Sequence, residues 1–161
     1  KYNFLGLRGN VEEQGMRRFF RRFATGNFDQ ENIKVETAKL AKFIEEWCQE
    51  NVVEIDQLAF LGYSNGANMV LATLLYYPKL IHKAVLLHPM LPFEPSQEIK
   101  LQNKSFLVSY GVGDQMIPAS ESIKAIHTLE SLGAKVSVVK HNGGHEVRKE
   151  EVESLNRFLL E

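Results

Sequence analysis

The chain has 161 residues, of which 44% are hydrophobic and 24% are charged, and its net charge at neutral pH is −1. These values are typical of one globular domain with a sizeable core, and they exclude the overall basic field that attracts nucleic acid. No apolar run reaches the roughly 20 residues that a membrane-spanning helix needs. The single cysteine, Cys48, cannot form an internal disulfide, which favours a reducing, cytoplasmic compartment.

Hydrophobic periodicity and breaker residues predict strands that alternate with helices. Strands are expected at 2–7, 57–61, 83–88, 105–110 and 135–140. Helices are expected at 30–51, 67–77 and 118–132, with a last helix that ends at residue 161. Residues 8–29 have the pattern of a long irregular segment. Several strands are continuously apolar, as in sheets covered on both faces, so the sequence predicts a single α/β domain, 1–161, with a mainly parallel sheet flanked by helices.

The most informative motif is Gly62-Tyr63-Ser64-Asn65-Gly66, between a predicted strand and a predicted helix. A serine on a tight strand-to-helix turn, with glycine two positions away on each side, is the pattern of a nucleophile elbow. We expect side chains at 62 and 66 to collide with the neighbouring strand and helix, so that glycine there allows the turn that exposes Ser64 Oγ. The alternative is an ordinary turn in which Ser64 is the helix N-cap.

Three reactive residues, Ser64, Asp114 and His145, each follow a different predicted strand. Functional residues gather at the carboxyl ends of such strands, and the chain order serine, acid, histidine is that of α/β hydrolases. We predict that Ser64 is the nucleophile, His145 the general acid and base, and Asp114 the residue that orients the imidazole. The backbone N–H of Asn65 would be one donor to the oxyanion.

Each member of this set has a structural alternative. Asp114 could be a turn aspartate near a helix start, and His145 could be an ordinary loop residue. Their joint placement at strand ends favours the catalytic interpretation. Among rival acids, Asp56 precedes its strand and lies at the wrong end, whereas Glu94 follows the strand 83–88 and stays open as an alternative.

No pattern in the sequence favours a metal site. His141 and His145 are four residues apart, but Asn142-Gly143-Gly144 between them argues against a helix that would place both on one face. The other histidines show no ligand spacing: His82, His88 and His127.

The segment Arg17-Arg18-Phe19-Phe20-Arg21-Arg22-Phe23 interleaves basic and aromatic residues. Such a segment can bind nucleic acid, but the net charge of −1 and the absence of another basic patch in the sequence argue against it. We expect the phenylalanines to pack over the mouth of the site. The arginines would face solvent, acidic partners such as Asp29 and Glu31, or an anionic substrate.

Apolar residues in the loops at the same edge could line an acyl pocket. The alternative is that they pack among themselves. The residues concerned are Met90, Leu91, Phe93, Met116 and Ile117, together with Phe20.

Short motifs spread over nearly the whole chain carry a resemblance to one enzyme family. They are Leu7-Arg8-Gly9-Asn10, Gly15-Met16-Arg17-Arg18, the segment around Ser64, His88-Pro89-Met90-Leu91-Pro92, Gly113-Asp114, Ile117-Pro118 and Gly143-Gly144-His145-Glu146. With them the chain resembles the phospholipase/carboxylesterase-like α/β hydrolases, the branch with acyl-protein thioesterases, dienelactone-hydrolase-like proteins and bacterial MhqD-like esterases. A dienelactone hydrolase proper would carry cysteine as the nucleophile, so Ser64 points to ester or thioester hydrolysis.

The resemblance also implies an N-terminal part that this sequence does not contain, with a strand and a loop that supplies the second oxyanion N–H. That strand would lie between the strands 2–7 and 57–61. We therefore expect this chain to be an N-terminally incomplete version of a full hydrolase, and direct pairing of Leu7 with Leu61 would contradict this.

The sequence thus predicts a bacterial serine hydrolase that cleaves carboxylic esters through an acyl-enzyme. The alternatives are a thioesterase or lysophospholipase, and a non-catalytic binding protein that keeps the fold. The expected partner is a small-molecule ester or thioester, with no nucleic acid and no membrane. No cofactor is needed, and the chain could form a homodimer.

Overall fold

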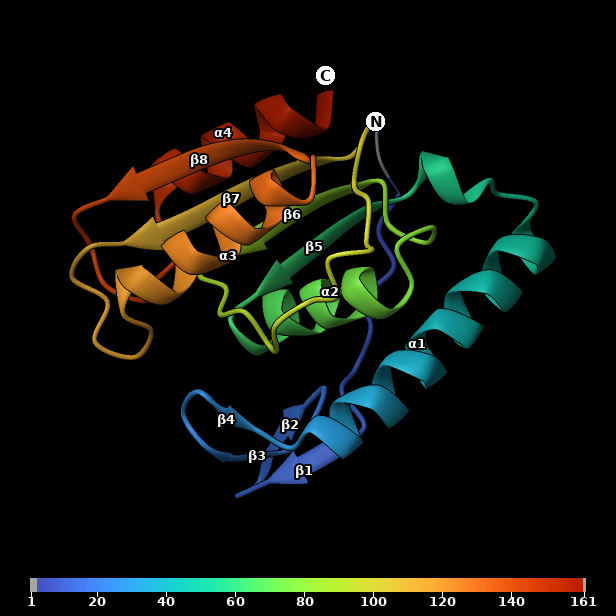
Figure 1. Ribbon diagram of the computed structural model, residues 1–161, viewed down its shortest axis with the longest axis horizontal. Helices are drawn as coiled ribbons and strands as arrows, with labels where there is room; N and C mark the ends of the chain where they lie inside the picture. The colour runs from blue at the N-terminus through green and yellow to red at the C-terminus, as the bar shows by residue number, and fades with distance from the viewer. Residues whose placement is uncertain (1–2, 161) are drawn as a thin grey trace.

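The centre of the molecule is a parallel sheet of four strands in the order β5-β6-β7-β8 (Figure 1). This computed structural model describes residues 3–160. The strands are β5 (Ala59–Tyr63), β6 (Lys83–Leu87), β7 (Ser105–Gly111) and β8 (Lys135–His141). Neighbouring strands are adjacent in sequence. Parallel pairing requires a long crossover connection, and those from β5 to β6 and from β7 to β8 each contain a helix.

The helices are α1 (Gln30–Asn51), α2 (Asn65–Tyr76), α3 (Ala119–Ser131) and α4 (Lys149–Leu160). The first has the bounds predicted from its apolar stripe. Its N-cap Asp29 accepts a hydrogen bond from the backbone N–H of Asn32, and it ends at Val52, whose φ is 56° and whose N–H bonds to Cys48 O. Within the described residues, no helix combines the length and the apolar character needed to cross a bilayer.

Alternating residues of each strand build two apolar layers, one on each face of the sheet. On one face, Ala84 and Leu86 of β6 join a core formed with α1, α2 and α3. On the other face, Val85 and Leu87 pack with Phe158 of α4. In Figure 1, α2 and α3 lie in front of the sheet and α4 lies behind it. The carboxyl ends of all four strands therefore point to one edge.

The N-terminal region differs from the prediction. Residue 2 lies outside the described residues, and residues 3–9 form no strand, so the expected strand at 2–7 is wrong for the part that can be seen. A strand needs a hydrogen-bonded neighbour, and none of these residues pairs with β5; Phe4 is 85% exposed. The β5 strand itself begins at Ala59, because the 3-10 turn η1 (Ile55–Gln57) precedes it.

The expected irregular segment, 8–29, contains two short antiparallel hairpins. One is formed by β1 (Val11–Glu13) and β2 (Met16–Arg18), the other by β3 (Arg22–Ala24) and β4 (Asn27–Phe28). Figure 1 shows these hairpins beside α1, beyond the face of the sheet that α2 covers. Phe28 of β4 and Phe20, in the link between the two hairpins, belong to a second apolar cluster, which also contains Met69 of α2.

Candidate active site

Ser64 lies on a strained turn between β5 and α2. Its φ is 52° and its ψ is −115°, a backbone conformation that residues other than glycine rarely adopt and that often marks a functional site. The turn is held from both sides, because the N–H of Ser64 donates to Leu87 O at 2.8 Å and the Ser64 carbonyl accepts from the N–H of Asn68 at 3.0 Å. The strain places the hydroxyl at the edge of the sheet rather than in the core.

Of the two glycines that flank Ser64, only Gly62 lies so close to neighbouring backbone that a side chain could not fit. A Cβ at residue 62 would lie 2.6 Å from backbone atoms of Ala67, so a side chain there would push α2 away from β5. At residue 66, the nearest atom would be in the Phe19 ring at 3.6 Å, an ordinary contact. The expected collision at position 66 is therefore wrong, because the helix turns that position away from the strand.

A continuous series of hydrogen bonds joins the three predicted residues. Ser64 Oγ lies 3.0 Å from His145 Nε2, and His145 Nδ1 lies 2.7 Å from Asp114 Oδ2. The residues follow β5, β7 and β8, and the structure brings them together although 81 positions separate Ser64 from His145. Because Asp114 accepts at Nδ1, a neutral His145 has its free lone pair on Nε2, directed at the serine hydroxyl.

The loop that carries His145 is fixed against the end of β7. A Cβ at Gly111 would lie 2.3 Å from Gly144 O, so only glycine permits this crossing. The N–H of Gly113 donates to Gly143 O at 3.0 Å. The Tyr63 hydroxyl, at the end of β5, also donates to the carbonyl of His145 at 2.7 Å, so the loop is held by the ends of two strands.

Asp114 is buried and hydrogen-bonded at both carboxylate oxygens. Burial alone would raise its pKa, but N–H donors from Ile117, the side chains of His145 and His88, and the backbone N–H of Met116 outweigh it and lower the pKa of Asp114 to about 2. The backbone N–H groups of Met116 and Ile117 both donate to Oδ1, at 2.8 and 2.9 Å. At neutral pH the group is therefore a fixed carboxylate.

Tyr63 also contacts the histidine ring, with ring centroids 5.2 Å apart. Burial and the nearby negative charges of Asp114, Glu151 and Glu146 raise the pKa of the Tyr63 phenol. The hydroxyl is therefore a proton donor across the neutral range.

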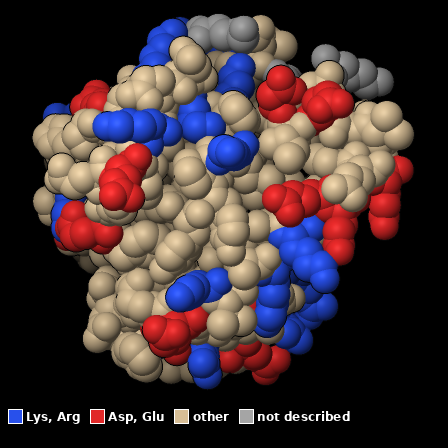
Figure 2. Space-filling view, turned by 45° about the vertical axis from the view of Figure 1, so that its right-hand side comes forward, with Lys and Arg blue, Asp and Glu red and all other residues tan. Residues whose placement is uncertain are grey.

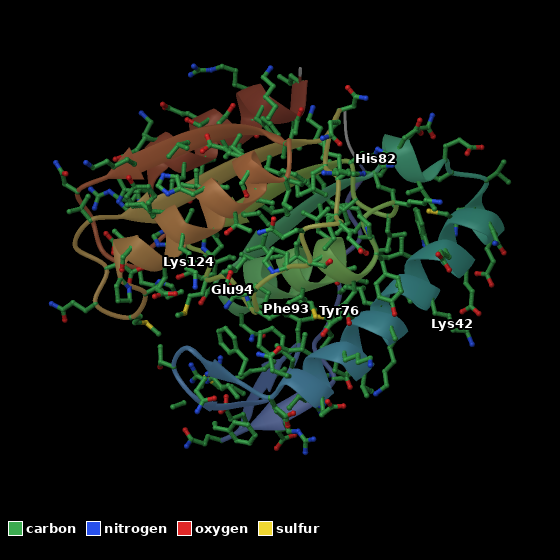
Figure 3. All side chains as sticks on the ribbon, viewed as in Figure 1. Lys42, Tyr76, His82, Phe93, Glu94 and Lys124 are labelled. Atoms are coloured by element: carbon green, nitrogen blue, oxygen red, sulfur yellow. The ribbon has the colours of Figure 1, made fainter. Side chains whose placement is uncertain are left out.

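The rival acids lie elsewhere. Glu94 is 70% exposed at its side chain and forms an ion pair with Lys124 of α3 at 2.5 Å (Figure 3). Asp56 lies in η1, before β5 and at the opposite end of that strand from Ser64. Asp114 is the carboxylate that contacts His145.

The predicted oxyanion donor, Asn65, is the first residue of α2. Its backbone N–H makes no hydrogen bond with any of residues 3–160, as is usual in the first turn of a helix. Its side-chain Oδ1 accepts from the N–H of Phe19 at 2.8 Å, which ties the N-terminal hairpins to the turn. The N–H is thus free to face a ligand while the side chain is fixed.

The apolar residues predicted to bind substrate divide into three groups. Phe20, Met90 and Ile117 are buried in one cluster, against which Phe93 packs; Phe93 also stacks on Tyr76 at 4.7 Å between ring centroids (Figure 3). Leu91 belongs to the main core, and Met116 is 58% exposed.

Two surface hollows, of about 560 and 500 Å³, lie away from Ser64. One is lined by α3 and the other by residues of the segment 140–150. Phe20, Met90 and Ile117 belong to one buried cluster, and their role in binding an acyl group stays a prediction.

The arginine-rich segment is largely neutralised within the hairpins. Arg18 and Arg22 pair with Glu13, and Arg21 pairs with Asp29 at 3.2 Å. On the face shown in Figure 2, positive and negative side chains lie next to one another. The segment therefore presents little free positive charge to a nucleic acid.

Sequence reasoning missed a buried polar group beside Asp114. His88 follows β6, His141 ends β8 and Glu151 lies in α4, and ligand atoms of the three lie within 4.8 Å of one another. His88, Asp114 and His145 form a second such set. Either could hold a divalent cation only if the imidazoles stopped donating to carboxylates. Spacing along the chain contains no signal for these groups, because four different elements contribute them.

Comparison with known proteins identifies the family of the chain. The phospholipase/carboxylesterase family model matches residues 19–161. A Bacillus subtilis (strain 168) protein, MhqD, which is named as a hydrolase, is 32% identical over 159 residues, covering 99% of this chain and 80% of that protein.

Two solved structures have the same fold. A Bacillus cereus carboxylesterase superposes with a TM-score of 0.91 and 37% identity, over 94% of this chain and 72% of that one. A Mesorhizobium loti carboxylesterase gives a TM-score of 0.88 and 28% identity, over 95% and 73% of the two chains. The predicted α/β-hydrolase fold is confirmed, and the chain belongs to the phospholipase/carboxylesterase family of α/β hydrolases.

Proposed function

We propose that this protein is a serine esterase that cleaves small-molecule carboxylic esters through an acyl-enzyme on Ser64. The observation that carries the proposal is the hydrogen-bond series from Ser64 Oγ through His145 to Asp114, with distances of 3.0 and 2.7 Å. A serine hydroxyl is a weak nucleophile at neutral pH, and an adjacent, oriented base is what activates it. The hydrolase family to which the chain belongs supports the same reaction class.

In the first half of the reaction, Ser64 Oγ attacks the carbonyl carbon while its proton passes to His145 Nε2. The Asp114 carboxylate stabilises the imidazolium that forms. His145 then gives that proton to the leaving alkoxide, the ester C–O bond breaks, and the acyl group stays on Ser64. In the second half, His145 removes a proton from water, the hydroxide attacks the acyl carbon, and the proton returns to Ser64 as the acid leaves.

The developing oxyanion needs donors that are in place before the reaction. The N–H of Asn65 supplies one, since it is free of acceptors among the described residues and lies at the first turn of α2. The positive end of the α2 dipole adds to the field at that point. Asn65→Ala would keep this backbone donor, so the role belongs to the main chain.

Hydrolysis of p-nitrophenyl esters of rising acyl length, with a thioester of matched acyl group, tests the proposal. We expect ester hydrolysis by the wild type and a loss on the order of 10³-fold or more in kcat in Ser64→Ala. Faster cleavage of the thioester would assign the protein to the thioesterase alternative. Equal rates for the wild type and Ser64→Ala would contradict the proposal and favour a non-catalytic binding protein.

A further inference from the structure

The Asp114 carboxylate is shared by two histidines, and the second has no part in the reaction described above. His88 Nδ1 lies 2.9 Å from Asp114 Oδ2, the same oxygen that accepts from His145 Nδ1 at 2.7 Å. The side chain of His88 is fully buried, so it cannot touch a substrate. Any effect of His88 on the reaction must therefore pass through Asp114.

The other edge of the His88 ring faces a second buried carboxylate. His88 Nε2 lies 3.2 Å from Glu151 Oε1 without forming a hydrogen bond, and Glu151 of α4 has no exposed side-chain surface. A buried carboxylate needs donors to replace water. Glu151 accepts from Ser109 Oγ at 2.5 Å and from the backbone N–H of Arg148 at 2.7 Å, so it is a fixed point on α4.

The remaining polar groups around His88 also favour an ordered network. The rings of His141, His145 and Tyr63 lie 5.4, 5.1 and 5.9 Å from the His88 ring, between centroids. His141 Nδ1 accepts from the N–H of Gly143, which leaves the proton of the neutral ring on Nε2, 3.4 Å from Glu151 Oε2.

Cationic side chains take no part in this network. Among the ion pairs of residues 3–160, no Lys or Arg side chain joins Asp114 or Glu151. The side chain of Arg148 pairs with Glu146 and Glu150 instead. Asp114 therefore depends on imidazole and backbone N–H donors for its position.

The backbone of His88 is itself held in an unusual conformation. Its φ is 51°, and its N–H donates at 2.9 Å to the carbonyl of Ser109, the same serine whose hydroxyl donates to Glu151. Residues other than glycine adopt this region at a cost that the surrounding structure must offset, and such residues cluster at functional sites. The strain turns the ring across the end of the sheet, between Asp114 and Glu151.

We propose that His88 and Glu151 are positioning residues of the esterase, an inference that rests on the proposed function. The Nδ1–H of His88 holds Asp114 Oδ2 where His145 needs it. Glu151 Oε1 packs against the far side of the ring, and this contact becomes an ion pair to α4 only when His88 is protonated at both nitrogens. The orientation of the His145 imidazole therefore depends on α4. This helix covers the face of the sheet opposite α2, the helix that follows Ser64.

Two substitutions at residue 88 distinguish a role of His88 in positioning Asp114 from a role in folding alone. Asn tolerates a positive φ better than other residues do, and its amide N–H₂ can replace Nδ1–H, so His88→Asn should keep kcat within about threefold of the wild type. His88→Leu removes the donor and should lower kcat roughly 10- to 100-fold, with KM changed less than twofold. Circular dichroism and thermal unfolding identify the folded fraction by which each kcat is normalised.

A matched pair on α4 tests the anchor. Glu151→Gln keeps the size of the side chain and removes its charge, and we expect kcat to fall roughly fivefold. Glu153→Gln, on the same helix and 58% exposed at its side chain, should leave kcat unchanged. Equal kcat values for the two variants would overturn the role of Glu151.

A spectroscopic readout makes the inference independent of turnover. In ¹⁵N-histidine-labelled protein, the ring resonances that disappear in His88→Asn should show a proton on Nδ1. An unprotonated Nδ1 at His88 would overturn the inference, as would wild-type kcat in folded His88→Leu. A wild type without Ser64-dependent hydrolysis would instead reveal failure of the proposed function, so the two failures are distinguishable.

Discussion

At the residue scale, the site combines backbone strain with hydrogen bonds to both carboxylate oxygens of Asp114. Ser64 and His88 both have positive φ, and each follows a strand of the central sheet. Asp114 accepts at both oxygens from fixed donors. The free energy that holds the strained turns comes from the surrounding packing, while the donors keep the carboxylate ionised. The proposed nucleophile and acid are thus set in place before a substrate arrives.

The lowered pKa of Asp114 predicts that part of the free energy of unfolding is lost at low pH. A carboxyl group whose pKa is lower in the folded state stabilises the fold when it is ionised. This contribution is complete at pH values above the unfolded-state pKa, and it is lost as the pH falls through the folded-state pKa. With a change from 3.8 to about 2, the Asp114 contribution of about 2 kcal/mol should disappear mainly between pH 4 and pH 2.

Urea unfolding at a series of pH values measures this effect. In Asp114→Asn, the free energy of unfolding should fall less steeply over that interval than in the wild type. Parallel pH dependence in the two proteins would contradict the assignment.

Removal of the Tyr63 hydroxyl should lower kcat by a small factor. In Tyr63→Phe the ring that contacts His145 remains, but the hydrogen bond to the His145 carbonyl is lost. Because one hydrogen bond is worth about 1 kcal/mol, kcat should fall roughly fivefold with little change in KM. Steady-state kinetics measure this, with Tyr76→Phe at the other end of α2 as the control. An effect of equal size in the control would remove the role of the hydroxyl.

At the element scale, the site depends on how closely the loop after β8 can approach the end of β7, and on how sharply the chain can turn after β5. The loop after β8 reaches Asp114 because Gly111, the last residue of β7, leaves room for the carbonyls of Gly143 and Gly144. The elbow after β5 depends in the same way on Gly62. Sheet pairing places the strand ends side by side, and these glycines bring the side chains within hydrogen-bond distance.

Gly111→Ala should therefore damage both stability and activity. Its Cβ would lie 2.3 Å from a backbone oxygen, which cannot move without displacing the His145 loop. We expect a loss of about 1–3 kcal/mol in the free energy of unfolding and more than a tenfold loss of kcat. Gly113→Ala is the matched control, because its nearest contact would be 3.2 Å. Equal effects of the two variants would show that the crossing is not the constraint.

At the scale of the whole molecule, the N-terminal segment 11–28 packs against α1 and α2 through one apolar cluster. Phe20 has no exposed surface and packs edge-on against Phe28, with ring centroids 5.3 Å apart. The same cluster contains Ile33 of α1 and Met69 of α2. Phe20 is therefore a structural link between the N-terminal hairpins and the helix that follows Ser64.

Phe20→Ala should lower the free energy of unfolding by about 3–5 kcal/mol, as truncation of a large buried aromatic does. Phe23→Ala, in the next hairpin strand and 74% exposed, should change it by less than about 0.5 kcal/mol. Chemical denaturation of the two variants measures the difference. Similar values would contradict the packing described for the cluster.

The sequence predicted the parts of this molecule that local patterns encode. The apolar stripe of α1 and the buried strands 83–87 and 105–111 are local features, and so are the strand ends that carry Ser64, Asp114 and His145. The strand expected at 2–7 is wrong over residues 3–7, because an apolar run forms a strand only beside a partner.

Long-range features could not be predicted. Whether Met90 and Ile117 would line a pocket or fill a core depends on what packs over them, and both belong to a buried cluster. The contact between His88 and Glu151 joins residues 63 positions apart on two elements (88 to 151). No spacing rule connects them.

The central claim is that Ser64 is a nucleophile activated by His145. Labelling of the folded protein with a fluorophosphonate, followed by mass spectrometry of the peptide that contains Ser64, tests it most directly. We expect one adduct per chain on Ser64, formed at least a hundredfold more slowly in His145→Ala, on the scale of a lost general base. No adduct on Ser64, or labelling at the same rate in His145→Ala, would contradict it.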